Sequence, residues 1–322
     1  MPNNTSYTPE EVAHILKISK YTVYELIKRG ELAAYRVGRK VRVEEPDIER
    51  YKQRSKAASS PSDTYASQDQ TSALTIDQPL ELSRPLARTE DSLVICGQDV
   101  MLDILTRHLL KQYPNLKFFR NYMGSIDGLL ALYRGEANLA TVHLWDSDTG
   151  DYNLPYIRRL MPGHQTVVIN LAFRMEGFYV RRGNPKKIMT WKDLARPDIR
   201  FINRERGSGA RVLLDEKLRL ESIPHHLING YFDEEHSHMA IASKVARGEA
   251  DVGLGIEKAA LQVPELDFIS LHKERYDLVL REEDLNKPIF QALLTTIRSP
   301  EYRKEVEGLG GYDVSRMGEI ME

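Results

Sequence analysis

The sequence predicts an α/β protein in three parts: a small helical module with a β-hairpin at residues 1–56, a linker at 57–90, and a two-lobed α/β domain at 91–322. Three observations carry this prediction. Two short amphipathic helical patterns near the N-terminus are followed by a stretch with a period of two. The next stretch is rich in Ser, Ala, Gln, Asp and Thr. From Ser92 onward, short apolar strands alternate with helices, as in α/β folds.

The composition limits the class of protein. The chain has 322 residues, a net charge of −2 and one cysteine, Cys96. Residues 1–56 contain twelve Lys/Arg and eight Asp/Glu, a net of +4, which leaves −6 for the remainder. A single cysteine excludes an internal disulfide framework. Together with the absence of a signal-like apolar start and of any run of about 18 apolar residues, it predicts a cytoplasmic protein with no membrane contact.

A capping box begins the first predicted helix. Thr8 and Glu11 stand three residues apart, with a proline at the first helical position and apolar residues at helical spacing behind it. Ser19 can cap a second helix over residues 20–29, and Gly30 follows at the position that a helix C-terminus favours. Two short helices with a tight turn between them form a candidate helix-turn-helix.

A basic hairpin follows the second helix. Residues 32–37 and 40–43 have the period of strands around a turn at 38–39, and a third helix begins near Pro46. Residues 28–42 hold six Lys/Arg and one Asp/Glu. A helix that fits the major groove, beside a wing whose cations reach phosphates, is what DNA recognition needs. The alternative is that these cations form an ordinary solvated face.

This module resembles the excisionase-type winged helix-turn-helix. The resemblance is carried by residues 8–13, 19–24, 30–32, 36–39 and 47–49. It implies that base edges are read by Lys20, Tyr21, Tyr24 and Lys28. It implies that the DNA backbone is contacted by Arg36, Arg39, Lys40 and Arg42.

The linker cannot bury enough apolar surface to fold by itself. Its first part, up to about Thr75, is polar, and residues 76–87 contain two prolines that favour an extended segment. We predict a flexible tether, which leaves the placement of the two halves to dimerisation or docking.

Strands and helices alternate at the start of the large domain. Predicted strands 93–96, 117–119 and 139–142 precede predicted helices 101–113, 126–134 and 154–160. We expect a mostly parallel sheet, in which ligands bind outside the carboxyl ends of the strands. The candidate ligand-binding residues at these ends are Gln98, Asp99, Asn121, Gly124, Ser125 and His143.

Two long segments are predicted to cross between lobes. One is the apolar run 166–181, and the return is formed by 266–269 and 276–280. Between them we expect helices at 191–194 and 238–247 and strands at 201–203 and 250–255. Two crossings between two lobes produce a cleft. The predicted lobes are lobe I at about 91–177 and 277–322, and lobe II at about 178–276.

A glycine-rich bend at residues 204–211 lies between a predicted strand and helix. Gly207 and Gly209 allow close approach of a ligand to the backbone, Ser208 adds a hydroxyl, and the free amides at the helix N-terminus favour an anion. Arg204 and Arg211 add positive charge. The alternative is an ordinary strand–turn–helix corner.

Residues 90–322 resemble the type 2 periplasmic-binding-protein fold, in a cytoplasmic form fused behind a DNA-binding domain. The resemblance rests on residues 135–140, 152–156, 203–211, 248–255 and 309–313. It is closest to regulators whose sensor domain is similar to molybdate- and tungstate-binding proteins. Gly97-Gln98-Asp99 and Ala210 stand where such relatives carry Ser-His-Asp and threonine. The oxyanion is expected at the helix N-termini of Ser125, Ser208 and Ser237, with His238 also facing the cleft.

We therefore predict a ligand-responsive transcription regulator that binds double-stranded DNA as a homodimer or higher homo-oligomer. The favoured ligand is molybdate or tungstate. One alternative is an organic anion such as a molybdenum-cofactor precursor, and another is a solute-binding or catalytic module whose N-terminal helices mediate protein contacts. No nucleophile with a recognisable base is found, so we expect neither an enzyme nor a cofactor.

Several histidines raise the question of a metal. His225, His226, His236 and His238, with acidic residues among them, could ligate an ion. The simpler account is a polar loop in which His238 faces the cleft, and we predict no metal site.

Overall fold

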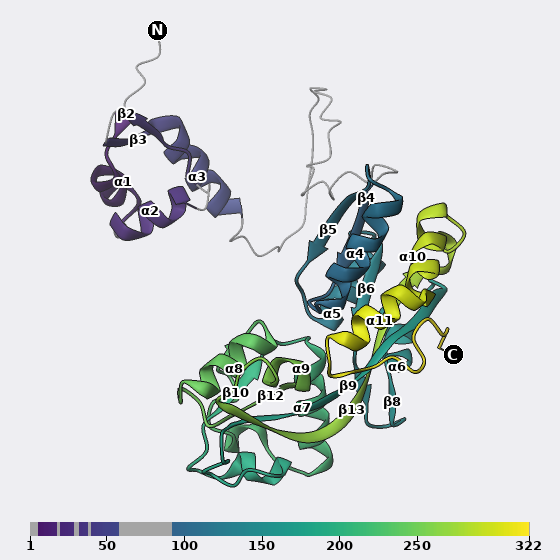
Figure 1. Cartoon of the computed structure of the whole chain (residues 1–322). Helices are drawn as coiled ribbons and strands as arrows, with labels where there is room; N and C mark the ends of the chain where they lie inside the picture. Colours follow the sequence, from purple (N-terminus) through teal and green to yellow (C-terminus); the bar gives the residue numbers. More distant parts are fainter. Residues whose placement is uncertain (1–5, 18–19, 29–31, 38–39, 58–91, 322) are drawn as a thin grey trace, which may run out of the picture. The chain divides into compact units, whose positions relative to one another are not determined.

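The computed structural model describes residues 6–17, 20–28, 32–37, 40–57 and 92–321. The chain divides into two compact units, Met1–Pro79 and Leu80–Glu322 (Figure 1). Within the described ranges, no helix is both long and apolar enough to cross a membrane. The boundaries at 56/57 and 90/91 stay predictions.

The N-terminal unit packs helices against a small antiparallel sheet. Its helices are α1 (Pro9–Leu16), α2 (Lys20–Lys28) and α3 (Glu45–Ala57). Its strands are β1 (Ser6–Tyr7), β2 (Tyr35–Val37) and β3 (Lys40–Glu44), in the order β1-β3-β2. The core that joins them consists of Val12, Ala13, Val23, Leu26, Leu32, Val43 and Ile48.

The predicted capping box at the start of α1 is confirmed. The Glu11 backbone N–H donates to Thr8 Oγ1 at 3.3 Å, and the Thr8 N–H donates to Glu11 Oε2 at 2.7 Å. The two helices and the hairpin are also confirmed, whereas β1, which pairs with β3, was not predicted. The predicted caps Ser19 and Gly30 lie outside the described residues.

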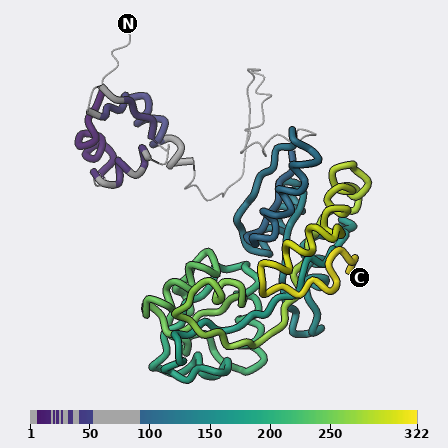
Figure 2. Tube along the Cα trace, viewed as in Figure 1, coloured from purple at the N-terminus to yellow at the C-terminus, as the bar shows by residue number. Residues whose placement is uncertain are grey.

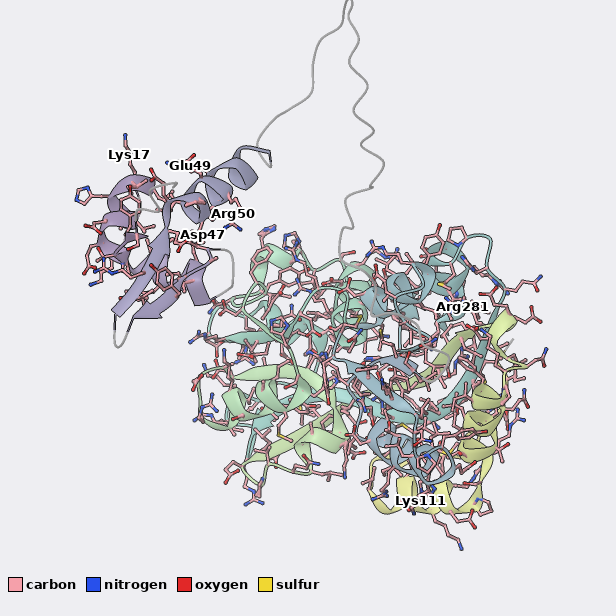
Figure 3. The ribbon with its side chains drawn as sticks, turned by 90° about the horizontal axis from the view of Figure 1, so that it is seen from above. Lys17, Asp47, Glu49, Arg50, Lys111 and Arg281 are labelled. Carbon is pink, nitrogen blue, oxygen red and sulfur yellow. The ribbon has the colours of Figure 1, made fainter. Side chains whose placement is uncertain are left out.

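Helix α3 carries charge pairs on its surface. Arg50 pairs with Asp47, both labelled in Figure 3. Lys52 Nζ lies 2.8 Å from Glu49 Oε1. Exposed pairs of this kind contribute about 0–1 kcal/mol. The helix is therefore held to the unit mainly by buried Ile48.

The C-terminal unit is built on a nine-stranded sheet in the order β11-β10-β12-β9-β13-β6-β4-β5, with β14 paired to β9. The strands on the lobe I side are β4 (Ser92–Cys96), β5 (Lys117–Asn121) and β6 (Leu139–Val142). Those on the lobe II side are β10 (Phe201–Arg204), β11 (Glu234–Glu235) and β12 (Val252–Ile256). Two long strands, β9 (Thr166–Arg181) and β13 (Leu266–Arg281), run side by side through the centre (Figure 2).

The prediction of a mostly parallel sheet is wrong for the sheet as a whole. The pairs within each lobe are parallel, namely β4 with β5 and β6, and β10 with β11 and β12. Because β9 and β13 cross in opposite directions, they pair antiparallel with each other and with β12 and β6. The return crossing, predicted as two segments, is the single strand Leu266–Arg281 with a register shift at Ser270/His272. The boundaries between the lobes, at about 177/178 and 276/277, stay predictions.

Helices cover both faces of each lobe. Lobe I has α4 (Met101–Gln112), α5 (Ser125–Tyr133), α6 (Leu154–Leu160), α10 (Pro288–Arg298) and α11 (Pro300–Gly308). Lobe II has a 3-10 helix (Trp191–Ala195), α7 (Gly209–Leu220), α8 (His238–Ala246) and α9 (Glu257–Ala260). A separate hairpin is formed by β7 (Trp145–Asp146) and β8 (Asp151–Tyr152). Helices α10 and α11 lie against α4 (Figure 1) and were not predicted.

Successive side chains of each strand point to opposite faces, so one strand serves two cores. In β4, Leu93 and Ile95 pack in the cluster with α4, α10 and α11, while Val94 and Cys96 pack in the cluster with α5 and α6. In lobe II, Phe201 faces the α7 cluster and Ile202 the α8 cluster. The near-continuous apolar runs of the sequence are explained by burial on both faces.

A C-terminal segment returns to the centre of this unit. Its strand β14 (Tyr312–Asp313) pairs with β9, and Tyr312 Oη donates to Asp99 Oδ1 at 2.8 Å. Lys273 Nζ lies 2.7 Å from Asp313 Oδ2, and Lys258 of α9 donates to the Leu309 carbonyl. The segment therefore contacts lobe I, lobe II and the crossing strands.

The crossing strands lie close together at Gly177 of β9. A Cβ at this position would lie 2.1 Å from the Ile269 carbonyl oxygen of β13. Gly177→Ala should therefore lower the free energy of unfolding by about 1–3 kcal/mol, as overpacking does. Urea denaturation measures this change. The control is Gly308→Ala, whose Cβ meets nothing within 4 Å, and which should be neutral or stabilising by up to about 1 kcal/mol. Equal effects of the two variants would contradict the close approach.

Candidate functional site

A cavity of about 360 Å³ lies between the two lobes. Lobe I contributes the residues that follow β4, β5 and β6, and lobe II contributes the ends of β10 and β12 and the starts of α8 and α9. Arg174 of β9 and Tyr276 of β13 line it from the crossing strands. The cavity therefore occupies the carboxyl ends of the strands of lobe I, where α/β sheets bind ligands.

Most of the sequence-predicted ligand residues line this cavity. They are Gln98, Asp99, Gly124, Ser125, His143, Arg204, Ser208, Ser237 and His238. Four predicted residues do not line it: Asn121, Gly207, Gly209 and Arg211. The sequence suggested Tyr122 and Tyr276 as walls for an organic ligand and His236 only as a possible metal ligand, and all three line the cavity. The polar lining residues that the sequence did not single out are Thr141, Arg174, Lys258, Gln262 and Tyr312.

Arg174 is the central cation of the site. Its Nη1 donates to Asp99 Oδ2 at 2.6 Å, its Nε donates to Glu274, and its guanidinium carbon lies 3.9 Å from the centre of the Tyr276 ring. The side chain is 3% exposed, and Nη2 has no hydrogen-bond partner in the structure. Burial opposes the charge, but Glu274 and Asp99 outweigh it and raise the pKa of Arg174. A buried cation with one unused donor at a cavity favours an anionic or carbonyl ligand.

The pattern of charges within β9 could have identified Arg174 as a site residue. Arg174 and Glu176 are charged residues at alternate positions of an otherwise apolar run, so they share one face of β9. Glu274 is the register partner of Arg174 on β13. Charged residues buried at one face of a strand must be paired, which marks them for a site.

Arg204 connects the lobes at the edge of the cavity. Its Nη2 donates to Gln98 Oε1 at 3.1 Å, and its Nε and Nη2 each lie 2.7 Å from a Glu205 carboxylate oxygen. Burial alone would raise the pKa of Glu205. The hydrogen bonds and charge of Arg204 outweigh burial, so the pKa of Glu205 lies below its usual value. Glu205 therefore holds the Arg204 guanidinium in place at the cavity through Nε and Nη2.

The three predicted serine hydroxyls have structural partners. Ser208 caps α7 and Ser237 caps α8, accepting from the N–H groups of Arg211 at 3.3 Å and Ala240 at 3.1 Å. Ser125 Oγ accepts from the His143 N–H at 3.3 Å. These hydroxyls fix the loops at the cavity.

Glycines let the lobes meet beside the cavity. The Ile126 N–H of lobe I donates to the Gly207 carbonyl of lobe II at 3.0 Å. A Cβ on Gly124 would lie 2.8 Å from the Ser208 nitrogen, and one on Gly209 would lie 2.5 Å from the His143 carbonyl oxygen. The glycine-rich bend, predicted as an anion cradle, serves in this structure as the contact between lobes.

The Arg211 side chain contacts Glu234 and Asp215 of lobe II and does not line the cavity. Its Nη1 lies 3.2 Å from Glu234 Oε1, its Nε lies 3.3 Å from Asp215, and its guanidinium carbon lies 4.1 Å from the centre of the Tyr231 ring. The side chain is 3% exposed. Two carboxylates and an aromatic ring hold the guanidinium, and the residue does not line the cavity.

His238 lies partly buried at the cavity. Burial, and then the charges of Arg204 and Arg174, hold its pKa well below the usual value. Its Nδ1 has no hydrogen-bond partner in the structure. His225 and His226 lie together in a short 3-10 helix with no ligand set around them among the described residues.

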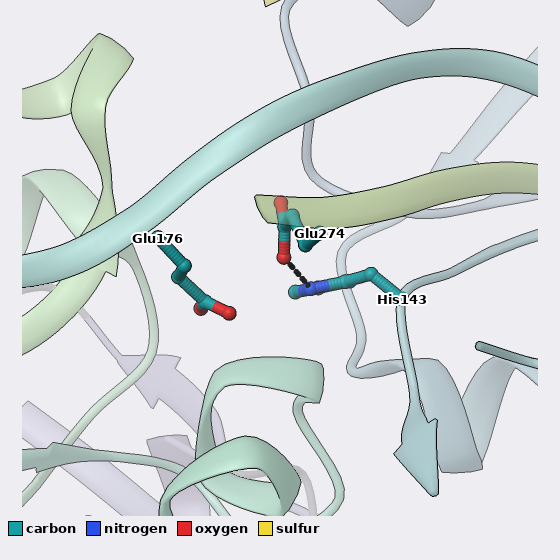
Figure 4. Close-up of side chains that lie close together, drawn as sticks. All are labelled: His143, Glu176 and Glu274. Carbon is teal, nitrogen blue, oxygen red and sulfur yellow. Dashed lines mark hydrogen bonds and ion pairs between the residues drawn. The ribbon is translucent and has the colours of Figure 1, made fainter. Parts of the chain in front are cut away.

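A buried trio lies where the crossing strands meet lobe I. His143 Nδ1 is 2.6 Å from Glu274 Oε2, and Glu176 points toward both (Figure 4). Burial and then repulsion from Glu274 raise the pKa of Glu176 well above the usual value. Burial acts in the same direction on Glu274, but Arg174 and His143 outweigh it and lower its pKa to about 2. Sequence reasoning placed His143 at the cleft but missed both glutamates.

The structure describes part of the predicted DNA surface. Tyr24 on α2 is 43% exposed, and Lys20 is half exposed and paired with Glu10. Arg42 on β3 is partly buried. Arg39 lies outside the described residues, as do the side chains of Tyr21, Lys28, Arg36 and Lys40. The assignment of these residues to DNA stays a prediction.

Arg174→Met removes the cation between Asp99 and Glu274 and should lower the free energy of unfolding at pH 7 by about 3–5 kcal/mol. The contribution of Glu274 is present above its normal pKa of 4.5 and is lost as the pH falls toward about 2. Urea denaturation at several pH values measures both effects. Arg107→Met, at the exposed pair with Glu305, should change stability by less than about 1 kcal/mol. A similar, small loss in both variants would contradict the buried pairing.

Comparisons with known proteins agree with this architecture. Residues 6–56 match the family described as helix-turn-helix domain, and residues 106–298 match the PBP superfamily domain. The uncharacterized protein YvgK of Bacillus subtilis is 41% identical over 324 aligned residues, which cover 100% of this chain and 99% of YvgK. An uncharacterized protein from the 5' region of a ferredoxin gene of Clostridium pasteurianum is 53% identical over 34% of this chain and 97% of its own length.

Solved structures show the same fold. A phosphate transporter substrate-binding protein with bound phosphate from Clostridium perfringens has a TM-score of 0.52 and 16% identity, over 69% of this chain and 98% of that one. EhuB in complex with hydroxyectoine has a TM-score of 0.51 and 13% identity, over 72% and 93%. Because the PBP superfamily domain matches residues 106–298, more than half of the chain, the protein belongs to this family, and it also carries a helix-turn-helix domain.

Proposed function

We propose that the protein is a DNA-binding transcription regulator whose activity responds to a small anion bound between the lobes of its sensor domain. The observation that carries the proposal is the interlobe cavity, with buried Arg174 and its unpaired Nη2 at the crossing strands. The helix-turn-helix domain in the same chain would bind the DNA whose transcription is regulated. Both domain types are known for binding rather than catalysis, so we propose no enzymatic role.

The charge arrangement favours an anion. Arg174 and Arg204 reach the cavity from two directions, and Lys258 also lines it. The N-terminal turn of α8 begins at the cavity, which adds a partial positive charge. His238 is neutral and can accept or donate a hydrogen bond without adding charge.

The size and lining of the cavity bear on the two ligands that the sequence left open. A volume of about 360 Å³ falls in the range of sites for organic ligands, about 300–1,000 Å³, and exceeds what four oxygens around one metal atom occupy. Aromatic and thioether side chains line it, namely Tyr122, Met123, Met239, Tyr276 and Tyr312. We therefore favour an organic anion over molybdate or tungstate.

Ligand binding and DNA binding are coupled through lobe closure in this proposal. A ligand that contacts lobe I, lobe II and the crossing strands binds the closed form best, and it can shift closure only by its differential affinity for the two states. Couplings of about 1–3 kcal/mol are typical, which correspond to about 5- to 150-fold in DNA affinity. We propose a homodimer, in which closure alters the spacing of two tethered helix-turn-helix domains.

DNA binding should depend steeply on salt. If four to six cations of the wing contact phosphates, the logarithm of affinity should fall with the logarithm of salt concentration with a slope of about −4 to −5 per monomer. Arg39→Ala should reduce this slope by about one, and Arg50→Ala on α3 should not. Tyr24→Ala should reduce sequence preference instead. Fluorescence anisotropy with the promoter of the protein's own gene measures all three. Salt-independent association, or none, would favour N-terminal helices that mediate protein contacts.

Anion binding should depend on Arg204. Arg204→Gln removes a charged donor at the cavity and should weaken anion affinity about 10- to 100-fold. Arg206→Gln is the matched control, because that side chain is 75% exposed and outside the cavity. Arg211→Gln should lower stability without changing affinity.

Thermal shift with molybdate, tungstate and a panel of organic carboxylates and phosphates measures these affinities. We expect the largest shifts from organic anions. Equal affinity of Arg204→Gln and the wild type for every anion that binds would overturn the assignment of this cavity.

A further inference from the structure

We propose that the trio His143, Glu176 and Glu274 binds a divalent transition-metal ion at the hinge between the lobes. The proposal adds a metal site beside the anion cavity, which His143 also lines, and it does not depend on which anion enters the cleft.

Three potential ligand atoms converge from three elements. His143 follows β6 of lobe I, Glu176 lies on β9 and Glu274 on β13. Their ligand atoms all lie within 4.8 Å of one another (Figure 4). Ligand atoms about 2.0–2.2 Å from a tetrahedral ion are about 3.4 Å apart, so the trio can close around an ion by small side-chain rotations.

Glu176 is the observation that points to a ligand. The residue is 1% exposed, and neither carboxylate oxygen receives a hydrogen bond from an N–H or O–H group of the described residues; its nearest polar neighbour is another acid, Glu274. A buried carboxylate without a partner costs several kcal/mol. Figure 4 shows its carboxylate directed at His143 and Glu274. An ion at that point would satisfy it.

The local charge also fits a divalent ion. Asp99, Glu176 and Glu274 bring three carboxylates to this buried region, and Arg174 is the cation that pairs with two of them. Arg204, the next arginine, is paired with Glu205. When Glu176 loses its proton to bind an ion, the three carboxylates exceed Arg174 by two charges, which is the charge of one divalent ion.

The ligand set and its surroundings indicate the class of ion. One imidazole and two carboxylates suit Zn²⁺, Mn²⁺ or Fe²⁺ rather than a soft ion that prefers thiolate. Arg174 Nε donates to Glu274, and the His143 ring meets the Tyr276 ring edge-on, with 5.9 Å between centroids. Outer partners of this kind orient metal ligands. Three protein ligands leave a coordination position open, as in sites that bind water or substrate.

The test uses the full chain, stripped with EDTA, dialysed and titrated with Zn²⁺ or Mn²⁺ at pH 7.5. Isothermal calorimetry and elemental analysis should show one ion per chain. Glu176→Gln keeps the shape of the side chain and removes a ligand charge. It should weaken metal affinity by more than about 100-fold, beyond the 10- to 100-fold loss seen for outer-shell partners. His143→Gln should do the same, so the test does not rest on one variant.

Asp277→Asn is the matched control. Asp277 is a buried carboxylate on the same strand, already bonded to Asn153, Asn170 and Arg275. It should bind the ion as tightly as the wild type, even if its melting temperature falls. Absence of a tight ion in the wild type would overturn the proposal and leave Glu176 as a buried, protonated acid. Binding that survives both Glu176→Gln and His143→Gln would also overturn it, and would assign the ion to surface histidines.

Discussion

The buried pairing of Arg174 with Asp99 and Glu274 is the constraint on which the sensor domain depends. Each of these side chains is at most 3% exposed, so all three charges have left water. Desolvation of each ion costs several kcal/mol, which only close pairing recovers. The arginine comes from one crossing strand, Glu274 from the other and Asp99 from the end of β4. The arrangement of the two crossings against lobe I is therefore fixed by electrostatics as well as by apolar packing.

This constraint changes how the cleft recognises a ligand. Binding at helix N-termini requires free backbone amides. In this structure the amide of Ile126 is bonded to the Gly207 carbonyl, and the serine hydroxyls hold their own loops. In the proposed function, recognition of an anion therefore relies mainly on the side chains of Arg174 and Arg204. The glycine-rich bend positions the lobes, and the arginines supply the charge.

The sequence predicted the local structure well because local rules determine it. The capping box at Thr8, the helices beside it and the whole of the crossing strand 166–181 follow from spacing and apolar runs. The strand direction of the sheet and the pairing of Arg174 with Glu274 did not follow. They depend on the register between strands about 100 residues apart, which no short pattern encodes.

The same reason explains which site residues were found. Residues just after strand ends, such as Gln98, Ser125 and His143, could be predicted because topology brings strand ends together. Arg174, Glu176 and Glu274 lie inside strands. They were not predicted as site residues, because the segments that contain them were interpreted only as apolar crossing strands. Arg211 was predicted from its charge near a bend, but its guanidinium turns to Glu234 and Asp215.

The C-terminal segment limits the motion of the lobes. Two crossing strands alone would act as a flexible hinge, but this segment adds attachments through Tyr312 to Asp99 and through Lys258 to Leu309. The Lys258 contact joins α9 of lobe II to Leu309 at the end of α11, so any motion that separates these two elements has to break it. A hydrogen bond to a charged group contributes about 1.5–3 kcal/mol. The closed arrangement is thus partly stabilised before any ligand arrives, and less of the ligand's binding energy is spent on closing it.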